Sequence, residues 1–152
     1  MRKAAMTAFR RMPAPLRRAA VRAGTPSYTV GAVALLRRDD GRLLFVDQRH
    51  SEGWALPGGL LRRGEDPDDA VVREVAEEIG VSLTSSELPV PVAAVNPRVR
   101  RVDLVYVLDA PADARPQQED AAEVRRVGWF AADQLPEVSE PTLEILRAVR
   151  LL

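Results

Sequence analysis

The sequence predicts one mixed α/β domain, in which helices flank a β-sheet. Three observations support this fold class: short apolar and β-branched runs are bounded by turn residues, a central segment has the features of a capped helix, and no segment repeats. The chain has 152 residues, which is enough to bury a single hydrophobic core. We therefore expect a mixed sheet with helices packed on it.

The first two strands are expected at residues 28–36 and 43–46. These segments read YTVGAVALL and LLFV, and both are rich in apolar and β-branched side chains. Asp40-Gly41 stands between them and is a strong hairpin signal. The two strands are therefore predicted to pair.

A helix is predicted at residues 67–79. Asp66 suits the N-cap, and Pro67 suits the first helical position, where its missing N–H is not needed. Gly80 is a natural stop at the other end. Spacing at helical intervals gives this segment one apolar face, formed by Ala70, Val71, Val75 and Ile79.

The second half of the chain continues the mixed pattern. Strands are expected at residues 90–95, 101–108 and 124–130, with Asn96-Pro97 as the turn between the first two. Residues 131–135 suggest a short helical turn, and residues 141–152 a final helix.

Charge divides the chain into two parts, a basic N-terminal extension that we place at residues 1–26 and a more acidic domain at residues 27–152. Residues 1–38 contain nine basic residues and no acid, which leaves 13 basic against 22 acidic residues in the remainder. The extension could be a transit peptide, or a basic stretch that binds an anionic membrane or nucleic acid. We favour a helical or frayed extension that packs on the acidic body or on a partner subunit.

Composition excludes several kinds of chemistry. The chain has no cysteine and one histidine, which rules out a disulfide framework, a thiolate zinc site and a cysteine nucleophile. No apolar run approaches the 18 residues that suggest a membrane-spanning helix, so we expect a cytoplasmic protein.

Carboxylates gather on the predicted helix. Glu74 lies three and four residues before Glu77 and Glu78, so like charges face one another, and each such pair destabilises a helix by roughly 0.2–0.5 kcal/mol. A bound cation would reverse that effect, and hard oxygen ligands favour Mg²⁺ or Mn²⁺ over zinc. The alternative is a solvated acidic face in which Arg73 pairs with Glu77.

The same residues belong to a longer pattern. The segment 59–81 reads GLLRRGEDPDDAVVREVAEEIGV and resembles the Nudix box, G-x5-E-x7-R-E-U-x-E-E-x-G-U with U apolar, at every specified position. The resemblance implies an α/β/α sandwich with a mixed sheet. It also implies a metal-dependent pyrophosphohydrolase that acts on a nucleoside diphosphate linked to another group.

The resemblance also implies individual roles. The metal would be held by Glu77, Glu78 and the Gly58 carbonyl, with Glu74 as a ligand or the general base. Arg73 would orient a catalytic carboxylate, while Glu65 and Gly59 would support the site. A further catalytic carboxylate is expected outside the box, and we favour Glu123, with Glu119 second.

Three residues are candidates for substrate binding. His50 follows the second strand, Trp54 opens the glycine loop Trp54-Ala55-Leu56-Pro57-Gly58-Gly59, and Arg98 follows the Asn96-Pro97 turn. In the resembled family a proline near the position of Pro97 is associated with ADP-ribose hydrolysis. The position of Pro97 therefore slightly favours a nucleotide sugar as the substrate.

Two other functions stay open: a nucleoside triphosphate pyrophosphatase of the sanitising type, and a sensor that binds nucleotide without cleaving it. We expect a small-molecule nucleotide as partner. A nucleic-acid partner is not expected, because the acidic remainder of the chain would repel a long polyanion. The oligomeric state stays open, with a homodimer as a common arrangement.

Overall fold

A computed structural model describes residues 9–152, so the part of the basic extension at residues 1–8 lies outside the described residues. The elements run, in chain order, α2 (Ala14–Gly24), β1 (Thr29–Arg37), β2 (Leu43–Gln48), β3 (Trp54–Ala55), β4 (Gly58–Leu60), α3 (Pro67–Ile79), η1 (Ser85–Glu87), β5 (Val92–Asn96), β6 (Arg101–Asp109), β7 (Val124–Phe130) and α4 (Glu140–Ala148).

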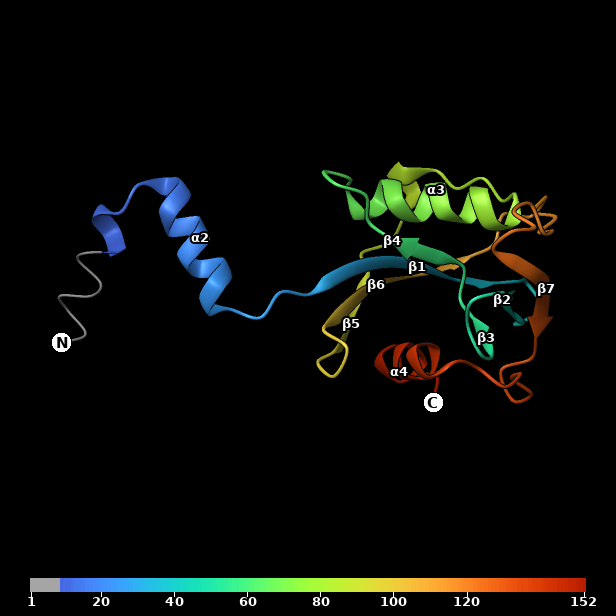
Figure 1. Ribbon diagram of the computed structural model, residues 1–152. Coiled ribbons are helices and arrows are strands. Elements are labelled where there is room, and N and C mark those ends of the chain that lie inside the picture. Colours follow the sequence, from blue (N-terminus) through green and yellow to red (C-terminus); the bar gives the residue numbers. More distant parts are fainter. Residues whose placement is uncertain (1–8) are drawn as a thin grey trace.

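The seven strands form one mixed sheet. Its main path is β3-β2-β1-β6-β5, while β4 pairs with β1 and β7 pairs with β2. The long central pair, β1 with β6, is parallel, and the other strand pairs are antiparallel. In Figure 1, α3 covers one face of this sheet and α4 covers the other, which confirms the predicted three-layer sandwich.

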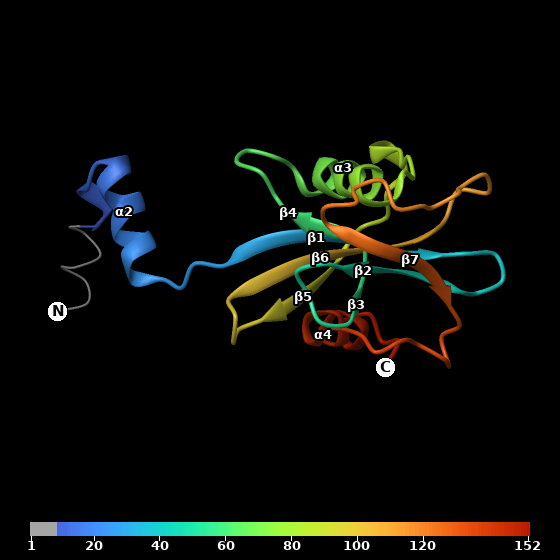
Figure 2. The ribbon, with the colours of Figure 1, turned by 45° about the vertical axis from the view of Figure 1, so that its right-hand side comes forward.

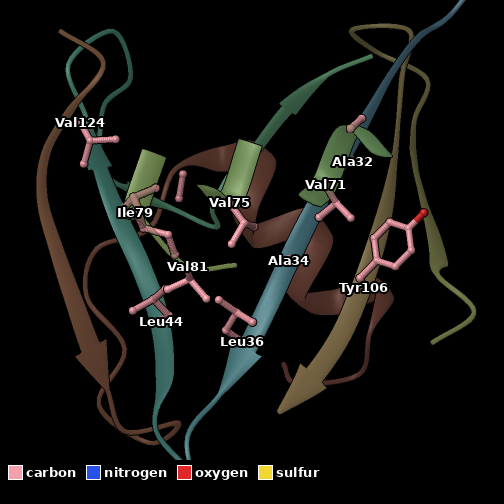
Figure 3. Close-up of a cluster of buried hydrophobic side chains, with 13 residues drawn as sticks. Ala32, Ala34, Leu36, Leu44, Val71, Val75, Ile79, Val81, Tyr106 and Val124 are labelled. Atoms are coloured by element: carbon pink, nitrogen blue, oxygen red, sulfur yellow. The ribbon is translucent and has the colours of Figure 1, made fainter. Parts of the chain in front are cut away.

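Each face of the sheet has its own hydrophobic core. The core under α3 joins the apolar stripe of that helix to β1, β2 and β6, and Figure 3 shows Tyr106 of β6 among these side chains. The core under α4 is formed mainly by Val33, Leu35, Phe45, Val105, Ile145 and Leu146. The two cores fix α3 and α4 on opposite sides of the same strands.

Most predicted elements are found within a residue or two, and α3 has the predicted limits. Gly80 closes α3 in the left-handed conformation, although the Asp66 side chain makes no capping hydrogen bond. Residues 131–135 form a turn and not a helix, and α4 ends at Ala148. The strands β3 and β4 were not predicted, because they are short and lie in a glycine-rich loop.

The predicted hairpin forms only in part. β1 and β2 pair at a single position, Arg37 with Leu43, with Gly41 in the left-handed conformation between them. Away from the turn, β2 pairs with β7. Along the edge of β1 that faces β2 at the turn, β1 pairs with β4. The strands therefore diverge and leave a gap that the glycine loop enters.

The helix α2 stands apart from the sheet. Figures 1 and 2 show it beside the domain, connected through residues 25–28, and no residue of α2 is buried. The expectation that this segment packs on the acidic body is therefore wrong for the single chain, since α2 carries alanines and arginines and few large apolar side chains. Within residues 9–152, no helix is long and apolar enough to cross a membrane.

Candidate active site

The glycine loop enters the sheet at β4. Gly58 pairs with Val33 of β1 and has a φ of 143°, a conformation that disfavours residues with a side chain. A Cβ atom at Gly58 would overlap the carbonyl oxygen of Ala32 and lie 2.6 Å from the Cα of Val33. Only glycine therefore allows the loop to pass this close to the central strand.

Arg73 organises the carboxylates of α3. Its Nε and Nη2 donate to the two oxygens of Glu65 at 2.7 and 2.9 Å, so the pair is bidentate. Its Nη1 donates to Glu74 at 2.6 Å and to Glu77 at 3.2 Å. Hydrogen bonds from Arg73 to these carboxylates raise the pKa of Arg73 and hold the guanidinium in the charged form. One cation thus positions three carboxylates.

Gly59 leaves room for the Glu74 carboxylate to pack against the loop. A Cβ atom at Gly59 would lie 2.5 to 2.9 Å from the carboxylate atoms of Glu74, well inside contact distance. The missing side chain lets this carboxylate rest directly on the loop backbone. The strand β4 and the helix α3 are therefore joined at the residues expected to carry the chemistry.

Glu78 points inward and is almost fully buried, with 2% of its surface exposed. One carboxylate oxygen accepts the Gly58 N–H at 2.8 Å, and the other accepts Nε2 of Gln48 at 2.9 Å. Burial raises the pKa of Glu78 to about 7, although both hydrogen bonds oppose this rise. A buried acid with two dedicated donors is held in one orientation.

Gln48 is a site residue that the sequence patterns did not indicate. It is the last residue of β2, beside a register shift in the pairing of β2 with β7, and it reaches across to α3. The only signal in the sequence was its place in a polar stretch directly after an apolar strand, a feature shared by many loop residues.

The acidic loop before β7 lies at the C-terminal end of α3. The backbone N–H of Glu119 donates to the Glu78 carbonyl at 3.2 Å, and the carboxylate of Glu119 lies over Gly80. The negative charge of Glu123 contributes to the raised pKa of Glu78. The structure thus places both expected carboxylates on the side of the site where Glu78 lies.

A cleft runs on the opposite face of the sheet, between the strands and α4. One cavity of about 190 Å³ is lined by Gln48, His50, Gly58 and residues of α4, among others. A groove of about 300 Å³ adjoins it between β5, β6 and α4, and Arg101, Pro141 and Ile145 line both. The glycine loop therefore separates the carboxylates of α3 from one end of this cleft.

The three substrate-binding candidates lie in different surroundings. His50 lines the cavity beside Gly58. Trp54 packs edge-to-face on Phe130, with ring centroids 4.8 Å apart. The Arg126 guanidinium lies over the Trp54 ring, 5.1 Å from its centroid. Arg98 lies in the turn after β5, and it is Arg101, at the start of the next strand, that lines the cleft.

The donor set fits a hard divalent cation, although its members are not gathered around one point. Among residues 9–152, no three side chains of ligating type come together as a ready-made metal site. The expected convergence of Glu74, Glu77 and Glu78 is therefore not present, because Arg73 draws two of them and Glu78 is buried. The three nevertheless share one helix face, and the Gly58 carbonyl supplies a further oxygen of the kind that Mg²⁺ and Mn²⁺ prefer.

Comparisons with known proteins agree with this geometry. A family model described as a NUDIX domain matches residues 27–149. A MutT-like protein of Streptomyces ambofaciens is 32% identical over 127 residues, which are 84% of this chain and 77% of that protein. A Bacillus subtilis protein provisionally named an 8-oxo-dGTP diphosphatase is 27% identical over 109 residues, 72% of this chain and 70% of its own length. A solved structure with a similar fold is the crystal structure of a MutT NUDIX hydrolase from Burkholderia pseudomallei, which superposes with a TM-score of 0.67. The two sequences are 30% identical, and the match covers 82% of this chain and 99% of that chain.

Proposed function

This chain belongs to the NUDIX family of hydrolases, and we propose that it is a pyrophosphohydrolase, dependent on Mg²⁺ or Mn²⁺, that cleaves nucleoside triphosphates. One observation carries the proposal. The Gly58 loop lines one end of a cleft that extends under α4, and its backbone binds Glu78, a member of the carboxylate row that Arg73 organises. A substrate in the cleft would bring its phosphates to this loop, which borders the carboxylates.

The residues that would hold the metal are Glu77, Glu78 and the carbonyl of Gly58, with Glu74 beside them as a further ligand or as the general base. When bound, divalent cations neutralise phosphate oxygens and lower the pKa of a coordinated water. The protein has to supply these ligands at fixed positions, and Arg73 and the Gly58 N–H provide that fixation for the side chains.

The proton of the attacking water needs a base. Glu74 rests against Gly59 and is held by a hydrogen bond from Arg73, which fixes its orientation. Glu123 is the second candidate, because its charge influences Glu78 from the loop before β7. We assign the base to Glu74 and a supporting electrostatic role to Glu123.

The substrate class is argued from Pro97 and from the relatives. In the sequence analysis, the position of Pro97 favours a nucleotide sugar as substrate. The turn alone accounts for a proline at this position, because Oδ1 of Asn96 accepts hydrogen bonds from the N–H groups of Arg98 and Val99 at 3.1 and 3.4 Å. Two Bacillus subtilis relatives carry different names: one is named for 8-oxo-dGTP and is covered over 70% of its length, and the other is named for ADP-ribose and is covered over 49%, so the more fully covered relative favours a triphosphate. We therefore place triphosphates first and nucleotide sugars, with ADP-ribose as the example, second.

A substrate screen tests both the reaction and its class. The purified protein would be incubated with Mg²⁺ or Mn²⁺ and, separately, with nucleoside triphosphates, ADP-ribose and other nucleotide sugars, and dinucleoside polyphosphates. The expected result is release of pyrophosphate and a nucleoside monophosphate from triphosphates, abolished by EDTA. Faster cleavage of ADP-ribose would replace the substrate class, and binding without cleavage of any compound would identify a sensor.

A further inference from the structure

Arg62 is a cation beside the α3 carboxylates that the proposed reaction does not use. It lies in the loop between β4 and α3, and its Nη2 donates to both oxygens of Glu77, at 3.2 and 3.3 Å. One nitrogen is thus placed between the two oxygens of a residue proposed to hold the metal. A metal ion held by Glu77 would need the same oxygens, so Arg62 and the metal compete for one carboxylate.

The pair between Arg62 and Glu77 is open to exchange. The two side chains are 63% and 50% exposed, and water screens an ion pair in such a position, so the pair holds its members only weakly. The pair between Arg73 and Glu65 is different, because its side chains are 16% and 13% exposed and two hydrogen bonds join them. Arg62 can therefore leave Glu77 without disturbing the ion pair that organises the carboxylate row.

The backbone of Arg62 is fixed, although its side chain is exposed. Its N–H donates to Oε2 of Glu65 at 2.7 Å, and its carbonyl accepts the N–H of Glu65 at 3.1 Å. Glu65 is in turn held by Arg73. A guanidinium released from Glu77 therefore stays within the length of one side chain of the α3 carboxylates.

We propose that Arg62 exchanges Glu77 for a phosphate group of the substrate, an inference that rests on the proposed function. Divalent cations in hydrolytic sites contact the phosphate oxygens, so the phosphates would lie beside Glu77 and within reach of Arg62. The planar guanidinium can donate two parallel hydrogen bonds to a phosphate. In this exchange Arg62 gains a phosphate as Glu77 gains a metal ion, so neither charged side chain is left without a partner.

The exchange predicts opposite effects of Arg62 on two binding steps. Without nucleotide, Arg62 competes with the metal for Glu77 and weakens metal binding. With nucleotide, the same side chain binds phosphate and strengthens the complex. The metal and the nucleotide should therefore bind with a positive coupling that depends on Arg62.

Equilibrium binding without turnover tests both effects in the full chain. Titration calorimetry would measure Mn²⁺ alone and then, in saturating Mn²⁺, a nucleoside triphosphate analogue with methylene groups in place of the bridging oxygens. R62A should bind Mn²⁺ alone about three- to fivefold more tightly than the parent, because a competing exposed ion pair is lost. It should bind the analogue at least about tenfold more weakly, because a hydrogen bond between charged groups is lost.

Arg63 provides the matched control. It is the next residue in the loop, it is exposed, and within residues 9–152 its side chain makes no hydrogen bond or ion pair. R63A removes the same charge and should keep both affinities within about twofold of the parent. R62K retains the charge but not the planar fork, so its affinity for the analogue should fall between those of the parent and R62A.

Two results would overturn the proposal. Equal weakening of the analogue in R62A and R63A would show that only the general positive charge of the loop matters. Unchanged or weaker binding of Mn²⁺ by R62A would show that Arg62 does not compete for Glu77. If both expected shifts are found but the parent hydrolyses no nucleotide with Mg²⁺, the proposed function fails and the role of Arg62 in nucleotide binding stands. Hydrolysis by the parent, with parent-like binding by R62A, gives the reverse conclusion.

Discussion

The backbone N–H of Gly58 donates a 2.8 Å hydrogen bond to Oε2 of Glu78 and so joins the glycine loop to the buried end of the α3 carboxylate row. The loop and the helix are 20 residues apart in sequence. Their contact depends on a backbone conformation that only glycine adopts readily, so the position of Glu78 and the course of the loop are determined together.

Replacing Glu77 or Glu78 by glutamine should reduce turnover by about two orders of magnitude or more, since loss of even an outer-shell partner of a metal commonly costs about 10- to 100-fold. The fold should remain intact. For E78Q the midpoint of thermal unfolding should stay equal or rise, because a buried carboxylate is exchanged for a neutral amide. Steady-state kinetics with Mg²⁺ and thermal melts would measure both.

Glu87 provides the control for these two variants. It is exposed in η1, and no hydrogen bond or ion pair in the described part of the chain joins its side chain to residues 73–78, so E87Q should behave as the parent protein in both measurements. Parent-like turnover in E77Q and E78Q would remove these two residues from the proposed metal site.

Replacing Gln48 by leucine should lower turnover about 10- to 100-fold through the loss of the 2.9 Å hydrogen bond to Glu78. If Gln48 acts only by positioning that carboxylate, the double variant Q48L/E78Q should be no slower than E78Q alone. Measured turnover in the four members of this cycle decides the question. Independent, multiplying losses would show that Gln48 acts on something other than Glu78.

The three glycines near the site should respond differently to alanine. G59A directs its Cβ at the tip of the Glu74 side chain, so it should reduce kcat about 10- to 100-fold with a change of less than about 1 kcal/mol in the free energy of unfolding. G58A meets backbone atoms at a positive φ and should destabilise the fold by about 3 kcal/mol. Urea unfolding and kinetics separate the two effects.

Gly64 supplies the matched control. It also has a positive φ, 79°, but no atom lies within 4 Å of the position that a Cβ would take, so G64A tests backbone strain alone. G64A should destabilise by about 1 kcal/mol and keep its kcat. A similar loss of kcat in G64A and G59A would mean that loop strain, and not displacement of Glu74, causes the loss.

Local sequence features predicted what local forces determine. The limits of α3 follow from Asp66-Pro67 and Gly80, and the strands β6 and β7 follow from their apolar runs, so these were predicted nearly residue by residue. The carboxylate row was also predicted, because helical spacing alone places Glu74, Glu77 and Glu78 on one helix face.

Contacts between distant segments could not be predicted in the same way. The bond from Gln48 to Glu78 joins residues 30 positions apart, and the cleft under α4 depends on β5, β6 and the C-terminal helix together. In the sequence, Arg101 was one of several arginines that could reach a phosphate, and Asp103 looked like an ordinary strand residue. Only the parallel pairing of β1 with β6 shows that Gly31 accommodates the carboxylate of Asp103.

The ion pair between Glu65 and Arg73 should make stability depend on pH in the acidic range. Hydrogen bonds from Arg73 and from the Arg62 N–H lower the pKa of Glu65 from its ordinary value of 4.5 to about 2. A lowered pKa means that the unfolded state binds the proton first as the pH falls, so the contribution of the ion pair to stability is complete above about pH 5 and is lost as the pH falls toward 2.

Urea unfolding of metal-free protein and of E65Q should therefore show the parent as more stable at about pH 7, with the difference in the free energy of unfolding shrinking below pH 4.5. E87Q should show no comparable pH-dependent difference, and a gap between parent and E65Q that stays constant from about pH 7 to about pH 3 would show that Arg73 does not hold Glu65 through its charge.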